Sequence, residues 1–335
     1  MNRFIKFISL LIILLGEFNH SSAQEKKPDT VKAGIYITSI HNIDFKEKEY
    51  TIDFWLWLKY KNKKFDFEKY LEIPQAKSFE KLFSKMDSSN EVYALTMKVQ
   101  CVMKDNWKTD SFPFDKQMLR LSIENSQFNN KELVFTKDTL GEQYDDTILS
   151  RVLNPWVIDR FYFNVGKKAY YTLFGVDNDE IRTPIGNTIK EEYSSVKIKI
   201  IIKHKKELWL FLKLFLGMYL AFFIAYVCLF IHSDNIDSRF GLCVGALFAV
   251  IGNKYIIDSS LPETTSFNLV DILHQITLFV ILAILIATIY SLKLIKTNKI
   301  KVAIKFDKII AIIIIVIYLF LNLYFIYEAN QSRGG

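Results

Sequence analysis

Residues 196–231 read VKIKIIIKHKKELWLFLKLFLGMYLAFFIAYVCLFI and contain the change that decides the fold. Up to Lys203, apolar and polar side chains largely alternate, which is typical of a β-strand with one buried face. The 24 residues from Leu208 to Ile231 are almost all apolar, and a helix needs about 20 such residues to cross a bilayer. The chain is therefore expected to leave a β-rich domain and enter a membrane at this point.

Three further apolar runs, of 18, 24 and 19 residues, predict three more spans at Phe240–Ile257, Leu269–Leu292 and Ile309–Tyr327. The four spans define a membrane domain at residues 207–329, with a tail at 330–335. The segment between the last two spans is rich in lysine, at Lys293, Lys296, Lys299, Lys301, Lys305 and Lys308. Because cytoplasmic loops are enriched in Lys and Arg, we expect this segment inside and the β domain outside the cytoplasm. The lysines of a cytoplasmic loop then account for much of the net charge of +7, so nucleic acid is not expected as a partner.

The N-terminus has the layout of a secretory signal peptide. Basic residues precede an apolar stretch at Phe7–Leu15, and small residues follow it. We therefore expect residues 1–23 to be removed and the β domain, residues 24–206, to be exported. Glu17 is unusual in such a segment, so an uncleaved anchor is the alternative.

Alternation with a period of two continues upstream, most clearly in YTIDFWLWLK at residues 50–59. Its aliphatic residues lie on one face, and its polar residues and two tryptophans lie on the other, as in a half-buried strand. Similar strands are predicted at Gly34–Ile40, Leu95–Met103, Met118–Ile123, Trp156–Val165 and Ser195–Lys203. Many strands and little helical periodicity favour an all-β, antiparallel sandwich of the immunoglobulin-like kind.

The sequence holds no arrangement that predicts an enzyme. It has no Ser/His/Asp arrangement, no His/Cys cluster and no glycine-rich phosphate loop, so catalysis, a metal and a cofactor are not expected. Its three cysteines, Cys101, Cys228 and Cys243, are an odd number, and two of them lie within apolar runs. Buried small side chains are therefore a simpler interpretation than a disulfide framework.

One face of the second span combines small and aromatic residues. Residues spaced by three or four positions share a helix face, and here they are Gly241, Gly245, Phe248, Gly252, Tyr255 and Ser259. This face has two interpretations. It can pack tightly against a neighbouring helix, or it can line a pore in which Phe248 forms a hydrophobic constriction.

Aromatic residues of the exported domain also allow two interpretations. Trp55 lies on the strand face opposite the aliphatic one, whereas Phe128, Phe174 and Tyr193 lie in or near turns. Packing within the sheets is the ordinary explanation. Aromatic side chains that converge at a subunit boundary would instead form a cage for a cationic or aromatic ligand.

The segment WKTDSFPFDKQML at residues 107–119 resembles the signature loop of the pentameric ligand-gated ion channels, the Cys-loop receptor superfamily. Upstream, GIYITSIHNIDFKEKEYTIDFWLWLKY at 34–60 resembles the first two strands of that family. Downstream, RFGLCVGALFAVIGNKYIIDSSLP at 239–262 resembles its pore-lining second span. The cysteines of the animal loop disulfide would fall at Asp105 and Leu119, so the resemblance is to the bacterial branch, which lacks this disulfide.

The resemblance covers nearly the whole mature chain and implies a ring of five identical subunits in a bacterial inner membrane. Each subunit would have a β-sandwich outside and four spans beside an axial pore. The ligand would bind between neighbouring sandwiches. Trp55 would come from one subunit, and Phe128 and the hairpin Phe174–Tyr193 would come from the next.

Coupling between the two domains is also implied by the resemblance. The signature loop, with Phe114 and Asp115, and the turn at Asp44–Glu49 would press on the outer loop around Pro262. In this way, closure around the ligand would reach the pore.

Selectivity is suggested by charges at the two ends of the second span. Asp237 stands before the inner mouth and Asp258 at the outer mouth, and fivefold repetition would turn each into an acidic ring that favours permeant cations. Arg239 and Lys254 oppose this preference, and the alternative is that the acidic residues simply lie in solvated loops.

The second span also departs from the family pattern. Phe248 stands where the family has a pore leucine, and Gly241 and Gly245 replace rings of hydroxyl groups. A non-conducting membrane receptor or ligand-binding protein that retains the fold is therefore the alternative function. The sequence does not identify the ligand: the aromatic positions permit an amine, and an acidic hairpin could sense protons or a divalent cation, with Asp177, Asp179 and Glu180.

Overall fold

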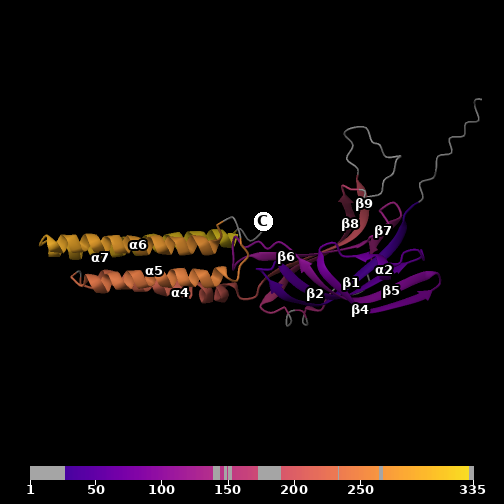
Figure 1. Cartoon of the computed structure of the whole chain (residues 1–335), viewed down its shortest axis with the longest axis horizontal. Helices are drawn as coiled ribbons and strands as arrows, with labels where there is room; N and C mark the ends of the chain where they lie inside the picture. The colour runs from indigo at the N-terminus through magenta and orange to yellow at the C-terminus, as the bar shows by residue number, and fades with distance from the viewer. Residues whose placement is uncertain are drawn as a thin grey trace, which may run out of the picture.

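A β-sheet domain and a bundle of four long helices follow one another along the long axis of the molecule (Figure 1). This computed structural model describes residues 27–138, 144–146, 149, 153–172, 190–232, 234–263 and 267–331. The predicted signal peptide and Phe174 lie outside the described residues, as do Asp177, Asp179 and Glu180. A β domain ahead of four apolar helices is the layout that the sequence predicts.

The β domain consists of two sheets. The first has five strands in the order β4-β5-β2-β1-β7, and the second has four in the order β3-β6-β9-β8. The strands of the first sheet are β1 (Asp29–Asp44), β2 (Glu49–Tyr60), β4 (Ala76–Ser89), β5 (Val92–Lys104) and β7 (Leu133–Lys137). Those of the second are β3 (Leu71–Glu72), β6 (Lys116–Asn125), β8 (Trp156–Tyr170) and β9 (Glu191–His204), and a short helix, α2 (Phe67–Tyr70), precedes β3.

Strand pairing departs from the prediction at one place. Among the described strands, every pair is antiparallel except β1 and β7, which run parallel. The long chain between these two strands leaves room for the crossover that a parallel pair requires. A purely antiparallel sandwich is therefore wrong for this edge.

A single apolar core joins the two sheets into a sandwich. Alternate side chains of β2 and β9 point into it, and these are Tyr50, Ile52, Phe54, Leu56, Leu58, Val196, Ile198, Ile200 and Ile202. Each of the six strands predicted from alternation lies within an observed strand. The period-two pattern predicts these strands because one face of each is buried in a shared core.

The strand β4 is not predicted from the sequence. It pairs with β5 over almost its whole length, although nearly all of its side chains are exposed. An edge strand with both faces open has no buried side to impose an alternating pattern. Pairing with β5 therefore defines this strand.

Trp57 lies directly over Gly34 of the neighbouring strand β1. A Cβ atom at Gly34 would lie 2.2 Å from Cε2 of Trp57. The indole Nε1 of Trp57 donates to Oδ2 of Asp138 at 3.0 Å, and the same oxygen accepts from Nζ of Lys59 at 2.9 Å. Gly34 thus provides the space in which Trp57 connects β2 to the segment after β7.

We expect Gly34→Ala to destabilise the protein by about 1–3 kcal/mol, because the new methyl group displaces Trp57 from its hydrogen bond. The measurement is the thermal unfolding midpoint of the full chain in detergent. Gly166→Ala is the matched control, since its Cβ would approach no described atom closer than 3.6 Å. Equal losses for the two variants would show that the contact with Trp57 is not the cause.

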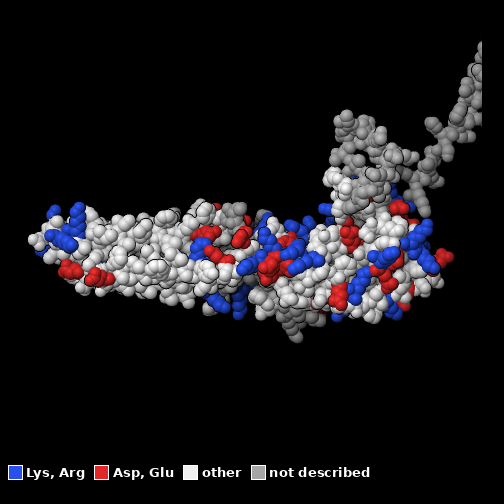
Figure 2. Space-filling view, viewed as in Figure 1, with Lys and Arg blue, Asp and Glu red and all other residues white. Residues whose placement is uncertain are grey.

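The second domain contains four long helices. They are α4 (Glu207–Val227), which continues into the short helix η1 (Cys228–Phe230), α5 (Ile236–Asp258), α6 (Leu269–Lys296) and α7 (Ile300–Gln331). Each is long and apolar enough to cross a membrane. Figure 2 shows a band largely free of charged side chains between the far tip of the bundle and the β domain. These features indicate a multi-pass membrane protein.

The lysine-rich turn between α6 and α7 lies at the end of the bundle away from the β domain (Figure 1). The helices α4 and α6 run away from the β domain, and α5 and α7 return toward it. At the near end, α6 begins with a capping box in which Asn268 and Asp271 exchange side chain to backbone hydrogen bonds. A membrane crossed by the bundle therefore separates the β domain from the lysine-rich turn.

Candidate functional site

Helix α5 packs between α4 and α6 along one side only. The side chains that it buries are Arg239, Cys243, Ala246, Val250 and Ile257. They recur at three, four or seven positions, as expected for the packed stripe of a helix. The opposite side of α5 is left open within the subunit.

The six residues predicted to share one face all lie on this open side. Phe248 is 70% exposed and Tyr255 is 75% exposed. Apart from the neighbouring residues and the adjacent backbone of α5 itself, no described atom would lie within 4 Å of a Cβ added at Gly241, Gly245 or Gly252. Ser259 is also exposed. None of the described helices of the subunit therefore covers this face, and tight packing against them does not explain its glycines.

The open face extends to Asp237, which is exposed and lies four residues before Gly241. We call this end of α5, which is away from the β domain, its inner end, and the end near the β domain its outer end. At about 1.5 Å per residue, Phe248 lies roughly 10 Å beyond Gly241 along the axis, and Tyr255 lies roughly 10 Å further. We call Asp237 and the six predicted residues the open face of α5. It has a carboxylate at its inner end, glycines along its length and an aromatic ring near its centre.

The two basic residues of α5 do not add free positive charge to this face. Arg239 is only 1% exposed and belongs to the packed side. Nζ of Lys254 lies 2.5 Å from Oδ2 of Asp258 and 2.8 Å from Oδ1 of Asp271. Two carboxylates therefore share one ammonium group at the outer end. No described cation lies within ion-pair distance of Asp237 at the inner end.

The turn between β1 and β2 and the loop between β5 and β6 meet at the junction of the two domains. The ring of Phe45 lies 5.2 Å from Trp107, 5.6 Å from Trp156 and 6.2 Å from Phe112. Nε1 of Trp107 donates to the carbonyl oxygen of Asp44 at 2.9 Å. The two segments predicted to act together are thus held in one aromatic cluster.

The same loop reaches two helices of the membrane domain. Phe114 is buried and stacks on Phe211 of α4 with ring centroids 5.4 Å apart. The carbonyl oxygen of Asp110 accepts a hydrogen bond from the backbone N–H of Leu269, the first residue of α6, at 2.9 Å. Through these contacts the loop packs on α4 and is hydrogen-bonded to the start of α6. The predicted contact point Pro262 is buried.

A cavity of about 640 Å³ separates the β1–β2 turn from the outer end of α5. It is lined by Lys46, Glu47, Lys48, Tyr255, Asp258, Ser259, Leu261 and Glu263. The turn therefore faces the end of the open face across a polar space.

Two buried ionisable groups flank the junction. His204, the last residue of β9, stacks on Trp156 with ring centroids 3.7 Å apart, and neither of its ring nitrogens has a hydrogen-bond partner among the described residues. Burial lowers the pKa of His204 to about 4. Burial raises the pKa of Asp115 to about 6, although Asp115 accepts a hydrogen bond from Gln117. The alternation of apolar and polar residues and the composition of this segment do not by themselves predict that His204 is buried.

The predicted ligand residues are divided between the two sheets. Trp55 on β2 lies edge-on to Phe83, with centroids 5.7 Å apart, and the Lys98 ammonium lies 6.0 Å from its ring. Phe128 follows β6 and packs on Phe65 at 4.9 Å. Tyr193 lies on β9. No contact among the described residues joins Trp55 to Phe128 or Tyr193, so a single subunit does not assemble these residues into one cage.

An acidic and aromatic cluster surrounds Tyr193. Its ring lies edge-on to Tyr170 at 5.7 Å, and its hydroxyl donates to Oε2 of Glu191 at 2.9 Å. The hydroxyl of Tyr170 donates to Oε2 of the buried Glu124 at 2.8 Å. Burial, followed by the bond to Glu191, raises the pKa of Tyr193 to about 12. The structure thus adds the carboxylates of Glu124 and Glu191 to the predicted site, because β9 pairs with β8 on one side and with β6 on the other.

Among the described residues, no three His, Cys, Asp or Glu side chains are placed to hold a metal ion. No protein-family model and no curated protein matches this sequence.

Proposed function

We propose that this chain is one subunit of a pentameric, ligand-gated and cation-selective channel of a bacterial inner membrane, with its β domain outside the cytoplasm. The observation that carries the proposal is the open face of α5. The opposite side of this helix packs against α4 and α6, whereas a continuous line from Asp237 to Ser259 has no covering group among the described residues.

The composition of this face supports a position at the axis of a ring. Helix α7 exposes branched and aromatic side chains, as suits contact with lipid, and among them are Ile312, Ile313, Val316, Leu319 and Phe320. The open face instead has glycine at three positions and a carboxylate at its inner end. Exposed Ile251 and Ile256, beside this face, would pack against neighbouring copies of α5. Five such helices would enclose a narrow polar path interrupted by rings of Phe248 and Tyr255.

The charges support selectivity for cations. Five copies of Asp237 would form an acidic ring at the inner end. At the outer end, the carboxylates of Asp258 and Asp271 outnumber the ammonium of Lys254 by two to one, which leaves a negative charge in each subunit. Arg239 faces away from the path.

The domain junction supports control by a ligand. A ligand that binds better to one arrangement of the sandwiches shifts the equilibrium toward that arrangement. Phe114 stacks on Phe211 of α4, and the carbonyl oxygen of Asp110 accepts a hydrogen bond from the start of α6. The loop between β5 and β6 thus connects the β domain to the two helices that flank α5. Movement of the loop would therefore shift the helices that hold the open face in place.

The second candidate is a non-conducting receptor of the same architecture. The feature that favours it is Phe248, because five bulky rings on an otherwise glycine-rich face can close a path completely. This receptor would bind its ligand and pass a signal through the membrane domain without ion flow.

Reconstitution of the purified full chain separates these functions. We expect native mass spectrometry to find five copies, and planar bilayers to show currents whose reversal potential in a KCl gradient follows K⁺. Asp237→Asn should move the reversal potential toward that of Cl⁻. A protein that assembles as a pentamer but passes no current, either as wild type or as Phe248→Ala, over a screen of amines, divalent cations and pH would be the receptor. A reversal potential that follows Cl⁻ would reject cation selectivity.

A further inference from the structure

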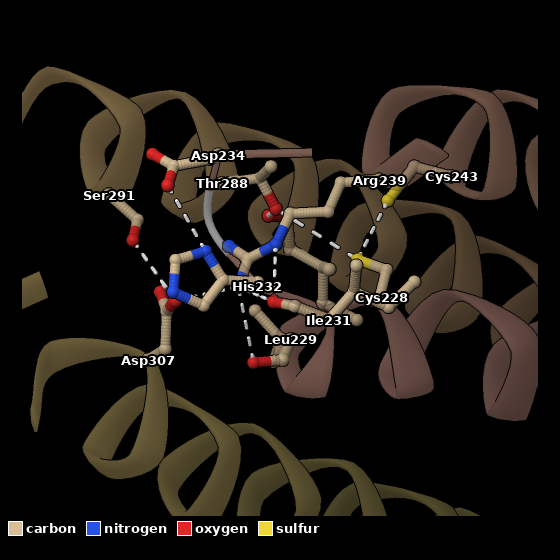
Figure 3. Close-up of polar contacts among 11 residues, drawn as sticks. Cys228, Leu229, Ile231, His232, Asp234, Arg239, Cys243, Thr288, Ser291 and Asp307 are labelled. Atoms are coloured by element: carbon tan, nitrogen blue, oxygen red, sulfur yellow. Dashed lines mark hydrogen bonds and ion pairs between the residues drawn. The ribbon is translucent and has the colours of Figure 1, made fainter. Parts of the chain in front are cut away.

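Arg239 is completely enclosed at the inner end of α5, among polar groups from other helices (Figure 3). Its Nε donates to the carbonyl oxygen of Ile231 at 3.0 Å, and its Nη2 donates to the same oxygen. Nη2 also lies 3.4 Å from the carbonyl oxygen of Leu229. These carbonyl groups belong to the end of η1 and the residue after it, so Arg239 ties the start of α5 to the end of the first span.

The same guanidinium is paired with Asp307 of α7. Nη2 lies 2.8 Å from Oδ2 of Asp307, and both side chains are less than a tenth exposed. The hydroxyl of Ser291 on α6 donates to the same carboxylate oxygen at 3.0 Å. One buried cluster, which we call the Arg239 anchor, therefore joins all four spans through Arg239, Asp307, Ser291 and the carbonyl groups of Leu229 and Ile231.

The anchor lies on the opposite side of α5 from the open face. With 3.6 residues per turn, Arg239 is rotated by about 200° from Asp237 and again from Gly241. Cys243, one turn beyond Arg239, is fully buried, and its Sγ lies 3.4 Å from Sγ of Cys228. The rotation that buries Arg239 and Cys243 is thus the rotation that turns Asp237 and Gly241 outward.

Stability alone is a weak reason for such an anchor. Desolvation of two charges offsets much of their attraction, and apolar residues of similar volume often stabilise a protein equally well. Loss of one partner, however, leaves the other as an uncompensated buried charge. A buried ion pair therefore penalises any rotation of α5 that separates Arg239 from Asp307, which an apolar contact would tolerate.

We infer that Arg239 is a positioning residue which, through its pair with Asp307, fixes the rotation of α5 about its own axis and thereby selects the residues that form the inner end of the open face. This inference rests on the proposed function in one respect, namely that the inner end of the open face lines the ion path. The rotation itself is a property of the subunit and can be measured without any current.

The reactivity of cysteines with a charged, membrane-impermeant methanethiosulfonate reports this rotation. The background carries Cys101→Ser and Cys228→Ser, so that Cys243 is the remaining thiol on the packed side. In a second protein, Cys243→Ser is combined with Gly241→Cys to place a thiol on the open side. With the anchor intact, we expect position 241 to react at least tenfold faster than position 243. Equal rates would overturn the inference before any anchor residue is changed.

Asp307→Asn is the variant that tests the pair. It keeps the size of the side chain but removes its charge, and we expect the ratio of the two rates to fall at least tenfold as α5 is released. Asp307→Glu restores the carboxylate and should restore most of the ratio. An unchanged ratio in Asp307→Asn would show that the pair does not set the rotation.

Asn322→Leu is the matched control on α7. Asn322 is buried and accepts a hydrogen bond from the hydroxyl of Tyr219, so its loss removes a polar contact that does not involve α5. We expect it to leave the ratio unchanged. An equal effect of Asn322→Leu and Asp307→Asn would mean that general loosening of the bundle, and not the anchor, exposes Cys243.

The outcome is independent of conduction. If the ratio responds to Asp307→Asn in a protein that never conducts, the anchor stands and the channel proposal fails. If the protein conducts and the ratio does not respond, the channel proposal stands and the anchor fails.

Discussion

Phe248→Ala is expected to raise the flux of K⁺ through vesicles containing the full chain by about tenfold or more. Phe248 is the largest side chain in the central part of the open face, and five phenyl rings at one level would exclude water from a narrow path. Removal of these rings leaves glycine above and below and widens the path at its driest point. A tenfold gain corresponds to a shift of roughly 1.4 kcal/mol toward the conducting state.

Phe279→Ala provides the control for this prediction. Phe279 lies on α6 and is 69% exposed, against 70% for Phe248, so the two substitutions remove equally accessible rings. Flux measured with a K⁺-sensitive dye should respond only to the change at Phe248. A similar gain in both variants would indicate a general loosening of the helices, and no gain in a conducting protein would place the constriction elsewhere.

The stability of the domain junction is expected to depend on pH in opposite directions in Asp115→Asn and His204→Phe. Asp115 binds its proton more tightly in the folded protein, since burial raises its pKa from 3.8 to about 6. Its contribution to stability is therefore fully present below pH 3.8 and is lost as the pH rises through about 6. His204 shows the reverse: burial lowers its pKa from 6.5 to about 4, so its contribution is fully present above pH 6.5 and is lost as the pH falls through about 4.

Each shift is about two pKa units, which corresponds to roughly 3 kcal/mol. The Asp115 window, from pH 3.8 to about 6, and the His204 window, from about pH 4 to 6.5, overlap between about pH 4 and 6, so the two contributions largely cancel there in the wild type. In Asp115→Asn only the contribution of His204 remains. The free energy of unfolding of this variant should therefore fall by roughly 3 kcal/mol relative to wild type as the pH is lowered from 6.5 to 4. His204→Phe keeps an aromatic ring between Trp156 and Phe112, and should gain a similar amount over the same range.

Denaturant unfolding of the full chain at pH 4.5, 5.5 and 6.5 measures these differences. The other titrating groups are shared by the three proteins, so the difference between each variant and wild type isolates one residue. If the free energy of unfolding depended on pH in the same way in all three proteins, neither Asp115 nor His204 would have a pKa shifted by burial.

Local pattern predicted much of this architecture. Six strands and four helices lie where alternation and apolar runs place them, because each pattern reflects a single environment: one buried face, or a lipid interior. The strand β4 was missed, since its exposed faces carry no such pattern. The grouping of Gly241, Gly245, Phe248, Gly252, Tyr255 and Ser259 also followed from spacing alone, but their exposure did not.

Spacing and composition are enough to predict a β-rich domain ahead of four apolar helices, and to place the glycines and Phe248 of the second span on one helix face. Such features depend on residues within a few turns of one another, which helix and strand periods relate directly. Long-range packing, in contrast, leaves this face open, buries Arg239 against Asp307 and places Lys254 between two carboxylates. It also encloses His204 between Trp156 and Phe112. The physical reason is that burial and charge pairing depend on partners far away in the chain, and Asp307 lies 68 residues beyond Arg239.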